Sequence, residues 1–251
     1  MQQPPRFMPD TSGLEIVTEV PERTMVIFAH PDDGELGAGG VIATWSAQGC
    51  DITMVVCTTG GSGSNDRAMD SQSIVPTRRA EQQEASRTVG AAHLEFLDHQ
   101  DGGLEDDRVF RGEIVRLIRR HRPHTIFCHD PHRFEGFNHR DHRMVGTVAL
   151  DAVYPYARDH LHFPEHIEDE GLEPHKVVQV LMWGSDRPNV IIDTSAGVET
   201  QILALHKHAS QIGGLRGGPQ VGDRLRERAE SVAESYQFQY GQVYRRIIAR
   251  R

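Results

Sequence analysis

Three features that are scarce or missing in this chain of 251 residues narrow its function. Its three cysteines, Cys50, Cys57 and Cys128, are odd in number and form no Cys-x-x-Cys pair, so reduced, buried cysteines in a reducing compartment are expected. No run reaches the roughly 18 apolar residues that a membrane span needs. The polar residues 1–22 lack the apolar core of a secretory signal, which predicts a cytoplasmic protein.

Positive charge is also scarce. The chain has 27 Lys and Arg against 36 Asp and Glu, a formal net charge of −9 with His neutral, which argues against a nucleic-acid or anionic-membrane partner. Fifteen histidines are the compositional outlier and favour a metal site. No composition shift divides the chain, so a single domain over residues 1–251 is predicted, with an irregular leader at residues 1–23.

Apolar runs and turn residues alternate along the rest of the chain. Buried strands are predicted at 24–29, 51–57, 93–97, 125–128, 177–183 and 190–192. Helices are predicted at 36–48, 77–89, 109–121, 141–154, 194–211 and 223–236, the last followed by an apolar and basic tail. We interpret 156–174 as an excursion or lid, and 60–76 and 212–222 as mobile loops. The alternation predicts an α/β fold with a mainly parallel sheet and helices on both faces.

The most informative segment directly follows the first predicted strand. His30, Asp32 and Asp33 lie at the carboxyl end of that strand, where open α/β sheets bind their ligands. His30 and Asp33 could both bind one cation, Asp32 could act as a general base, and Glu35 could orient a ligand. The alternative is a strand-end turn in which an aspartate caps the following helix.

A second polar group, at residues 139–142, begins a predicted helix about a hundred residues later. A helix that follows a strand places its first side chains at the same edge of the sheet. His142 could be a third zinc ligand, His139 could donate a hydrogen bond to an oxyanion, and Asp141 could hold an imidazole in one tautomer and raise its pKa. A polar helix cap with surface histidines is the alternative. Together the two groups suggest zinc-assisted hydrolysis.

These two motifs resemble the LmbE-like (PIG-L) family of zinc-dependent N-deacetylases. The resemblance rests on residues 30–40 (HPDDGELGAGG) and 139–143 (HRDHR). Weaker matches are Arg78 with Glu81, residues 101–104 (DGGL) and residues 208–211 (HASQ), so that the likeness spans residues 25–211. It implies a Rossmann-like sheet and removal of an acetyl or related acyl group from an N-acetylglucosamine-type sugar.

The resemblance also implies roles for individual residues. One Zn²⁺ per chain would be bound by His30, Asp33 and His142. Asp32 would be the general base, and His139 would stabilise the oxyanion or protonate the amine, supported by Asp141. The substrate would be contacted by Arg78, Asp101 and His208.

Two departures concern the substrate. Gly61 stands where many members that act on sugar–inositol substrates carry Glu, and Phe137 stands where some carry Tyr. We therefore expect a larger conjugate to be preferred to free N-acetylglucosamine. The partner is a small amino-sugar molecule, and a homo-oligomer is compatible with the sequence.

Several alternatives stay open from the sequence alone. The protein could be an amidase that removes a larger acyl group from a thiol–sugar conjugate, or an inactive sugar- or metal-binding homologue. Residues 37–40 (GAGG) invite a nucleotide-binding interpretation but lack the Gly-x-Gly-x-x-Gly spacing. Arg78 could pair with Glu81 along its helix, and His208 could be an ordinary helix-face histidine.

Overall fold

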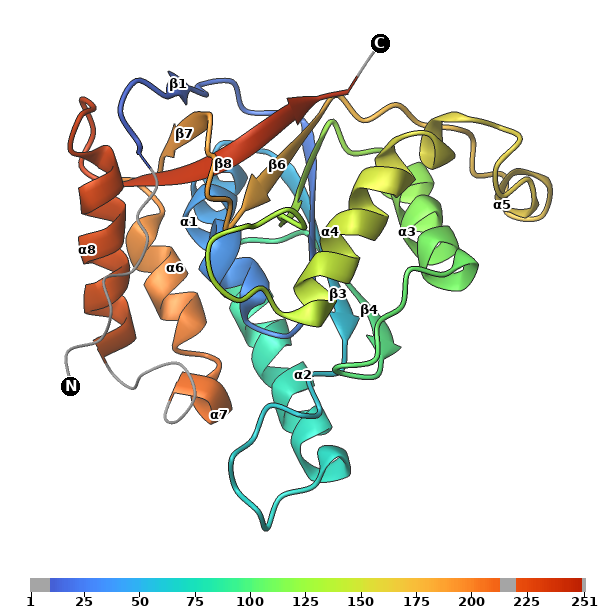
Figure 1. Cartoon of the computed structure of the whole chain (residues 1–251), viewed down its shortest axis with the longest axis horizontal. Coiled ribbons are helices and arrows are strands. Elements are labelled where there is room, and N and C mark those ends of the chain that lie inside the picture. Colours follow the sequence, from blue (N-terminus) through green and yellow to red (C-terminus); the bar gives the residue numbers. More distant parts are fainter. Residues whose placement is uncertain (1–9, 213–219, 250–251) are drawn as a thin grey trace.

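A computed structural model describes residues 10–212 and 220–249 of the chain. Its strands form one eight-stranded sheet in the order β1-β7-β8-β6-β5-β2-β3-β4 (Figure 1). The strands are β1 (Glu15–Ile16), β2 (Arg23–Phe28), β3 (Asp51–Thr58), β4 (His93–His99), β5 (Thr125–His129), β6 (Gln179–Trp183), β7 (Val190–Asp193) and β8 (Gly241–Ile248). The helices are α1 (Asp33–Ala47), α2 (Ser71–Thr88), α3 (Arg108–His121), α4 (Arg140–Val153), η1 (Tyr156–Arg158), α5 (Glu165–Glu168), α6 (Val198–Leu205), α7 (Ala209–Ile212) and α8 (Val221–Ala233).

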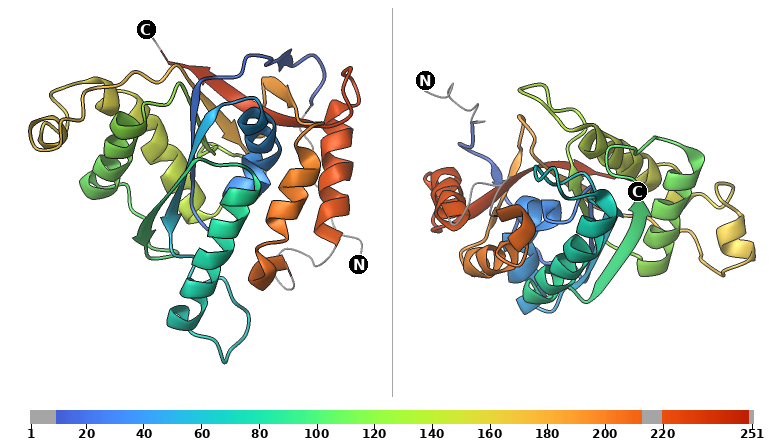
Figure 2. Two further views of the ribbon diagram at one scale, coloured as in Figure 1. Left: turned by 180° about the vertical axis from the view of Figure 1, so that it is seen from behind. Right: turned by 90° about the horizontal axis from the view of Figure 1, so that it is seen from below.

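Helices cover both faces of the sheet, as predicted (Figures 1 and 2). Along β2, Met25 and Ile27 pack into the core beneath α3 and α4, whereas Val26 and Phe28 pack into the core beneath α1 and α2. Successive side chains of a strand point to opposite faces, so burial on both sides explains the continuous apolar run of β2. The prediction of an α/β fold with a mainly parallel sheet is confirmed.

The order of the central strands creates a crevice. The chain passes from β2 to β3 and β4 on one side and then returns to β5 on the other side of β2, with all these neighbouring pairs parallel. Connections after β2 and β5 therefore leave in opposite directions, which is the topological switch point where such sheets bind ligands. The turn after β2 and the start of α4 meet at this point.

The residues after the terminal helix form a strand instead of the predicted tail. β8 is inserted between β6 and β7 and is antiparallel to both. Its Tyr244 is fully buried and contacts Phe127, with ring centroids 5.0 Å apart. Because most of its other side chains are partly exposed, β8 lacks the continuous apolar run that marks the parallel strands.

Two helix predictions are wrong in their bounds. Thr77, where a helix was predicted to begin, lies inside α2. This helix begins six residues earlier at Ser71 and is capped by the Asp70 carboxylate, which accepts from the Ser73 N–H. Pro76, which was placed in the loop predicted at 60–76, lies inside α2. The helix predicted at 194–211 is divided into α6 and α7, and the break contains His208.

The segment at 156–174 is an excursion and not a lid. It connects the C-terminal end of α4 to the first residue of β6, so it lies at the sheet edge opposite the switch point. Buried Arg119 holds it by donating hydrogen bonds to the carbonyl oxygens of Tyr156, Asp159 and Phe163, among others. Most of the other predicted loop, 212–222, lies outside the described residues.

β1 gives a short ordered element to residues that were predicted to be an irregular leader, and it pairs with β7. The three cysteines are free and buried. Among the described helices, none combines the length and the apolar character that crossing a membrane requires.

Candidate metal and catalytic site

Two imidazoles converge on one carboxylate oxygen at the switch point. Asp33 Oδ2 lies 3.0 Å from His30 Nδ1 and 3.1 Å from His142 Nε2. Burial raises the pKa of Asp33, but the two histidines outweigh it and hold the pKa well below its usual range. An ionised carboxylate between two imidazole nitrogens is the type of donor set that suits a divalent cation such as zinc.

The second nitrogen of His30 contacts two further carboxylates. Its Nε2 lies 3.1 Å from Asp101 Oδ1 and 3.2 Å from Asp141 Oδ2. Burial lowers the pKa of His30, but hydrogen bonds to Asp101, Asp141 and Asp33 raise the pKa to about 11. A carboxylate on the second ring nitrogen is the usual means of orienting a metal-binding histidine. In this structure Asp101 therefore contacts a candidate ligand.

His139 lies at the N-terminal end of α4, close to both candidate imidazole ligands. Its ring centroid is 4.8 Å from that of His30 and 5.2 Å from that of His142. Its Nδ1 accepts a hydrogen bond from the Asp141 backbone N–H, so the proton of the neutral ring is on Nε2. Burial and then the neighbouring His30 and His142 lower the pKa of His139. The carboxylate of Asp141 contacts His30, and its raising effect on the pKa of His139 is smaller than these lowering effects.

Asp32 has an unusual backbone conformation that α2 supports. Its φ of 100° lies in the left-handed region, which is uncommon for a residue with a side chain. The Asp32 N–H donates to Gln82 Oε1 at 3.0 Å, and Gln82 Nε2 donates to Glu35 Oε1 at 2.6 Å. Arg78 donates to the Pro31 carbonyl and lies 3.5 Å from Asp32 Oδ2. Gln82 was not singled out in the sequence, although it lies one helical turn from Arg78.

His208 and Glu81 join α7 to this network. The His208 side chain is fully buried, with its Nε2 3.5 Å from Glu35 Oε2. Burial lowers the pKa of His208, but Glu35 raises it more, so that the net shift is upward. Glu81 accepts hydrogen bonds from Ser210 N and Oγ. Buried Arg78 thus contacts Asp32, and buried His208 contacts Glu35.

A histidine at the site was also missed by the sequence interpretation. His129, the last residue of β5, stacks on His142 with ring centroids 3.9 Å apart, and its Nε2 lies 3.7 Å from Asp33 Oδ2. Trp183 Nε1 donates to His129 Nδ1 at 3.1 Å. Because an indole N–H only donates, Nδ1 of His129 is an acceptor, and the Ala29 N–H donates to its Nε2 at 3.4 Å. The sequence signal that could have identified His129 is its position directly after the strand predicted at 125–128.

Three groups of these residues have ligand atoms within 4.8 Å of one another. They are His30–His139–His142, Asp33–His129–His142 and His30–Asp101–Asp141. The first two groups share His142 and between them contain all three predicted zinc ligands. Imidazole nitrogens and a carboxylate oxygen are donors that zinc accepts, so the residues present fit a zinc ion in their chemistry.

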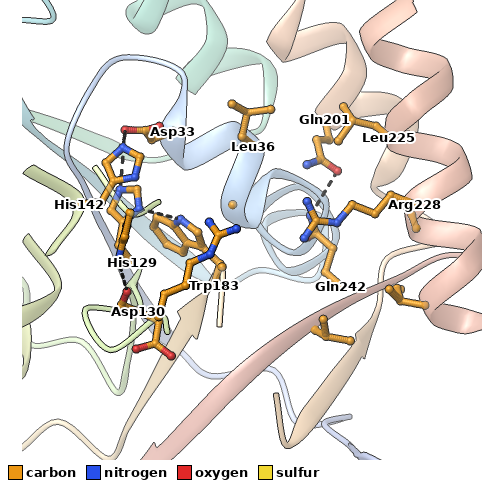
Figure 3. A pocket seen from close by; sticks show the side chains of 18 of the residues that line it. Asp33, Leu36, His129, Asp130, His142, Trp183, Gln201, Leu225, Arg228 and Gln242 are labelled. Atoms are coloured by element: carbon orange, nitrogen blue, oxygen red, sulfur yellow. Dashed lines mark hydrogen bonds and ion pairs between the residues drawn. The ribbon is translucent and has the colours of Figure 1, made fainter. Parts of the chain in front are cut away.

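A cavity of about 380 Å³ begins at this cluster (Figure 3). Asp33, His129 and His142 line one end, and the walls continue through Leu36 and Trp183. Gln201, Leu225, Arg228 and Gln242 line the side away from the histidines. The predicted substrate contacts Arg78, Asp101 and His208 are not among the described residues that line it.

Comparisons with known proteins agree with this geometry. Residues 25–153 match the family described as PIG-L, GlcNAc-PI de-N-acetylase. The diacetylchitobiose deacetylase of Thermococcus kodakarensis is 30% identical over 191 residues, covering 76% of this chain and 70% of that protein. The 1D-myo-inositol 2-acetamido-2-deoxy-alpha-D-glucopyranoside deacetylase of Mycobacteroides abscessus is 29% identical over 229 residues. That alignment covers 76% of this chain and 81% of that protein. The structure of N,N'-diacetylchitobiose deacetylase from Pyrococcus horikoshii superposes with a TM-score of 0.81 at 25% identity, covering 91% and 84% of the two chains.

Proposed function

Because the chain belongs to the PIG-L family of de-N-acetylases, we propose that it is a metal-dependent hydrolase that removes an N-acetyl group from an N-acetylglucosamine-type conjugate. The observation that carries this proposal is that the imidazoles of His30 and His142 both contact the carboxylate of Asp33. Asp33 directly follows Asp32 in the chain and lines one end of the cavity. The relatives named above support the substrate class. The metal we propose is one zinc ion per chain, held by those three side chains.

The reaction follows from the surrounding residues. Zinc at this position would supply a Lewis acid for the acyl carbonyl and would lower the pKa of the attacking water. Asp32 accepts the proton of that water, with its backbone held by Gln82 and its carboxylate near Arg78. His139 donates a hydrogen bond from Nε2 to the developing oxyanion. The leaving amine then receives a proton from Asp32 or His139.

The domain and compartment follow as further parts of the proposal. We propose one domain over residues 1–251, supported by the single continuous sheet. A cytoplasmic location is supported by three free, buried cysteines.

The test is release of primary amine from a panel of N-acetylglucosamine glycosides, with and without a chelator. Asp32→Asn preserves shape and removes basicity, so we expect unchanged zinc content and a kcat lower by roughly two to four orders of magnitude. Exposed Asp66 provides the matched control, Asp66→Asn, which should retain activity. Near-normal turnover in Asp32→Asn would place the base elsewhere. Zinc binding without amine release from any glycoside would favour an inactive binding homologue.

A further inference from the structure

The wall of the cavity contains a carboxylate that the proposed reaction does not use. Asp130 directly follows β5, lines the cavity and is only 3% exposed. Figure 3 shows it beside His129, on the same side of the cavity as Asp33 and His142. A sugar whose N-acetyl group lies at the candidate zinc ligands would therefore lie close to Asp130.

The polar atoms of Asp130 are paired with neighbouring groups, with one exception. Its N–H donates to the Trp183 carbonyl at 3.0 Å, and its own carbonyl accepts from Asn138 Nδ2 at 3.1 Å. Its carboxylate Oδ1 accepts from the His132 N–H at 2.8 Å. The other carboxylate oxygen, Oδ2, is buried and has no hydrogen-bond partner among the described residues. The residue is thus held from several sides, and one acceptor atom remains.

The donor for this oxygen must come from outside the described chain. Arg133 is the nearest arginine along the sequence, and its Nε donates to the Glu135 carbonyl at 3.0 Å. A buried acceptor that lacks a donor is unfavourable, and native structures contain few of them. Because Asp130 lines the cavity, a molecule bound there could supply the donor to Oδ2.

A sugar hydroxyl group is the donor that suits this position. A carboxylate oxygen accepts hydrogen bonds and repels anions. The nitrogen of an N-acetylglucosamine unit belongs to the bond that is cleaved, so it would lie at the metal site, and the other donors of the sugar are hydroxyl groups. Trp183 lines the same cavity. Ligand pockets combine aromatic surface of this kind with a few fixed polar groups that orient the ligand.

We propose that Asp130 binds the substrate by accepting, at Oδ2, a hydrogen bond from one hydroxyl group of the N-acetylglucosamine ring. The proposal rests on the proposed function and adds a specificity-determining residue to it. Because neighbouring groups already hold Asp130 in place, little conformational freedom is lost when this contact forms. A sugar that lacks the hydroxyl group leaves Oδ2 unpaired and is therefore a poorer substrate.

The first test compares the methyl glycoside of N-acetylglucosamine with its 3-deoxy, 4-deoxy and 6-deoxy derivatives. We expect kcat/KM of the zinc-loaded protein to be about tenfold lower, or more, for the derivative that lacks the contacted hydroxyl group. This is the usual scale of a hydrogen bond to a charged group. The derivative that is affected identifies the hydroxyl group.

The second test assigns that preference to Asp130. Asp130→Asn keeps an oxygen for the His132 N–H and replaces the second oxygen with an amide nitrogen, which cannot accept. We expect kcat/KM for the parent glycoside to fall about tenfold or more, and kcat/KM for the affected deoxy derivative to change little. The ratio of the two values should therefore approach one. A merely structural role would lower kcat/KM for all compounds alike.

Asp193→Asn is the matched control. Exposed Asp193 accepts from the N–H of Ser195, two residues further on, as Asp130 does from His132. Asp193 is not among the described residues that line the cavity. This control should keep the kcat/KM values of the unmodified protein for every compound.

The inference and the proposed function fail in different ways. Equal kcat/KM across the deoxy series, a ratio that Asp130→Asn leaves unchanged, or an equal loss for all compounds in that variant would overturn the inference and leave the deacetylase activity in place. Absence of amine release from every compound would contradict the proposed function. Calorimetric dissociation constants of the same compounds for zinc-loaded unmodified protein and Asp130→Asn would then decide the inference. Equal affinities across the series in the unmodified protein would overturn it.

Discussion

At the scale of single residues, Asp32 depends on side chains that never reach the cavity. A non-glycine residue held in a sparsely populated backbone region costs about 1–3 kcal/mol and persists only where its surroundings compensate. Here the Gln82 amide oxygen accepts a hydrogen bond from the Asp32 N–H. The Glu35 carboxylate accepts a hydrogen bond from the Gln82 amide nitrogen and so orients that amide. Arg78 holds the preceding carbonyl of Pro31. Two side chains of α2, Gln82 and Arg78, thus hold the backbone of the candidate base in place.

Replacing Gln82 tests this dependence. Gln82→Met is close in shape but removes the amide hydrogen bonds to Asp32, Glu35 and Ser86. It leaves the Asp32 N–H and the Glu35 carboxylate with fewer partners. We expect about 1–3 kcal/mol of lost stability and a kcat reduced about tenfold or more, with KM and zinc content less affected. Steady-state kinetics, metal analysis and denaturant unfolding would measure these effects. Exposed Gln83 supplies the control, Gln83→Met, and a normal kcat in Gln82→Met would contradict the positioning role.

The buried pair of His208 and Glu35 should make stability depend on pH. Since Glu35 raises the pKa of His208 above its ordinary value of 6.5, the pair stabilises the folded state fully below pH 6.5. That contribution is lost as the pH rises through the folded-state pKa. The difference in unfolding free energy between the metal-free unmodified protein and His208→Gln should therefore be largest at acidic pH and decrease toward alkaline pH.

Urea unfolding of both proteins at several pH values, in the presence of a chelator, would measure that difference. His206→Gln, at an exposed position two residues away, is the control and should show little pH-dependent difference. A difference that grows with increasing pH would show that the sign of the His208 shift is wrong.

At the scale of elements, the site requires α4 to lie very close to β5. A Cβ atom on Gly146 would lie 2.5 Å from the carbonyl oxygen of His129 and 2.8 Å from Pro131 Cδ. Contacts this short with backbone cannot be accommodated without moving the helix. The absence of a side chain at Gly146 thus allows His142 to stack on His129 and approach Asp33.

Gly146→Ala should therefore displace α4 and, with it, the candidate zinc ligand His142. Overpacking of this kind costs about 1–3 kcal/mol of stability, and displacement of α4 moves His142 away from Asp33. We expect zinc affinity to fall about tenfold or more, as measured by competition with a chelator. Thr147→Ala, at the partly exposed adjacent position, should keep both affinity and stability near normal. Unchanged zinc affinity in Gly146→Ala would show that α4 does not set the geometry.

At the scale of the whole molecule, the proposed zinc site joins parts of the fold that are distant in the chain. His30 and Asp33 lie on one side of the switch point, and His142 comes from α4 on the other face of the sheet. A ligand that binds only the folded state stabilises it by mass action. A shared ion should therefore stabilise the sheet and the helices together.

Metal removal tests this coupling. Chelation should abolish amine release and lower Tm, and added zinc should restore both. At free zinc one hundred times Kd the expected gain in unfolding free energy is about 2.7 kcal/mol. Asp33→Asn weakens the donor set, so its Tm should respond much less to zinc. An equal zinc response in that variant would show that the proposed ligand set is wrong.

Much of this molecule is determined by its sequence alone. The apolar runs of β2, β3 and β5 predict buried parallel strands because burial on both faces needs apolar residues at every position. The polar residues at 30–33 directly follow one strand, and those at 139–142 begin a helix, so local chain direction places both at one sheet edge. The family likeness of the two motifs then indicates their chemistry, and the comparisons confirm the family.

Other features were decided only by the tertiary structure. β8 enters the middle of the sheet because partners distant in the chain bury it, although its own pattern of apolar residues is weak. His129 and Gln82 reach the site because β5 lies next to β2 and α2 packs beneath the turn, and neither contact is encoded by local spacing. Arg133 and Arg228 line one cavity despite their separation in sequence. Periodicity reports which side of an element is buried, whereas the order of strands and the packing of helices determine which side chains meet.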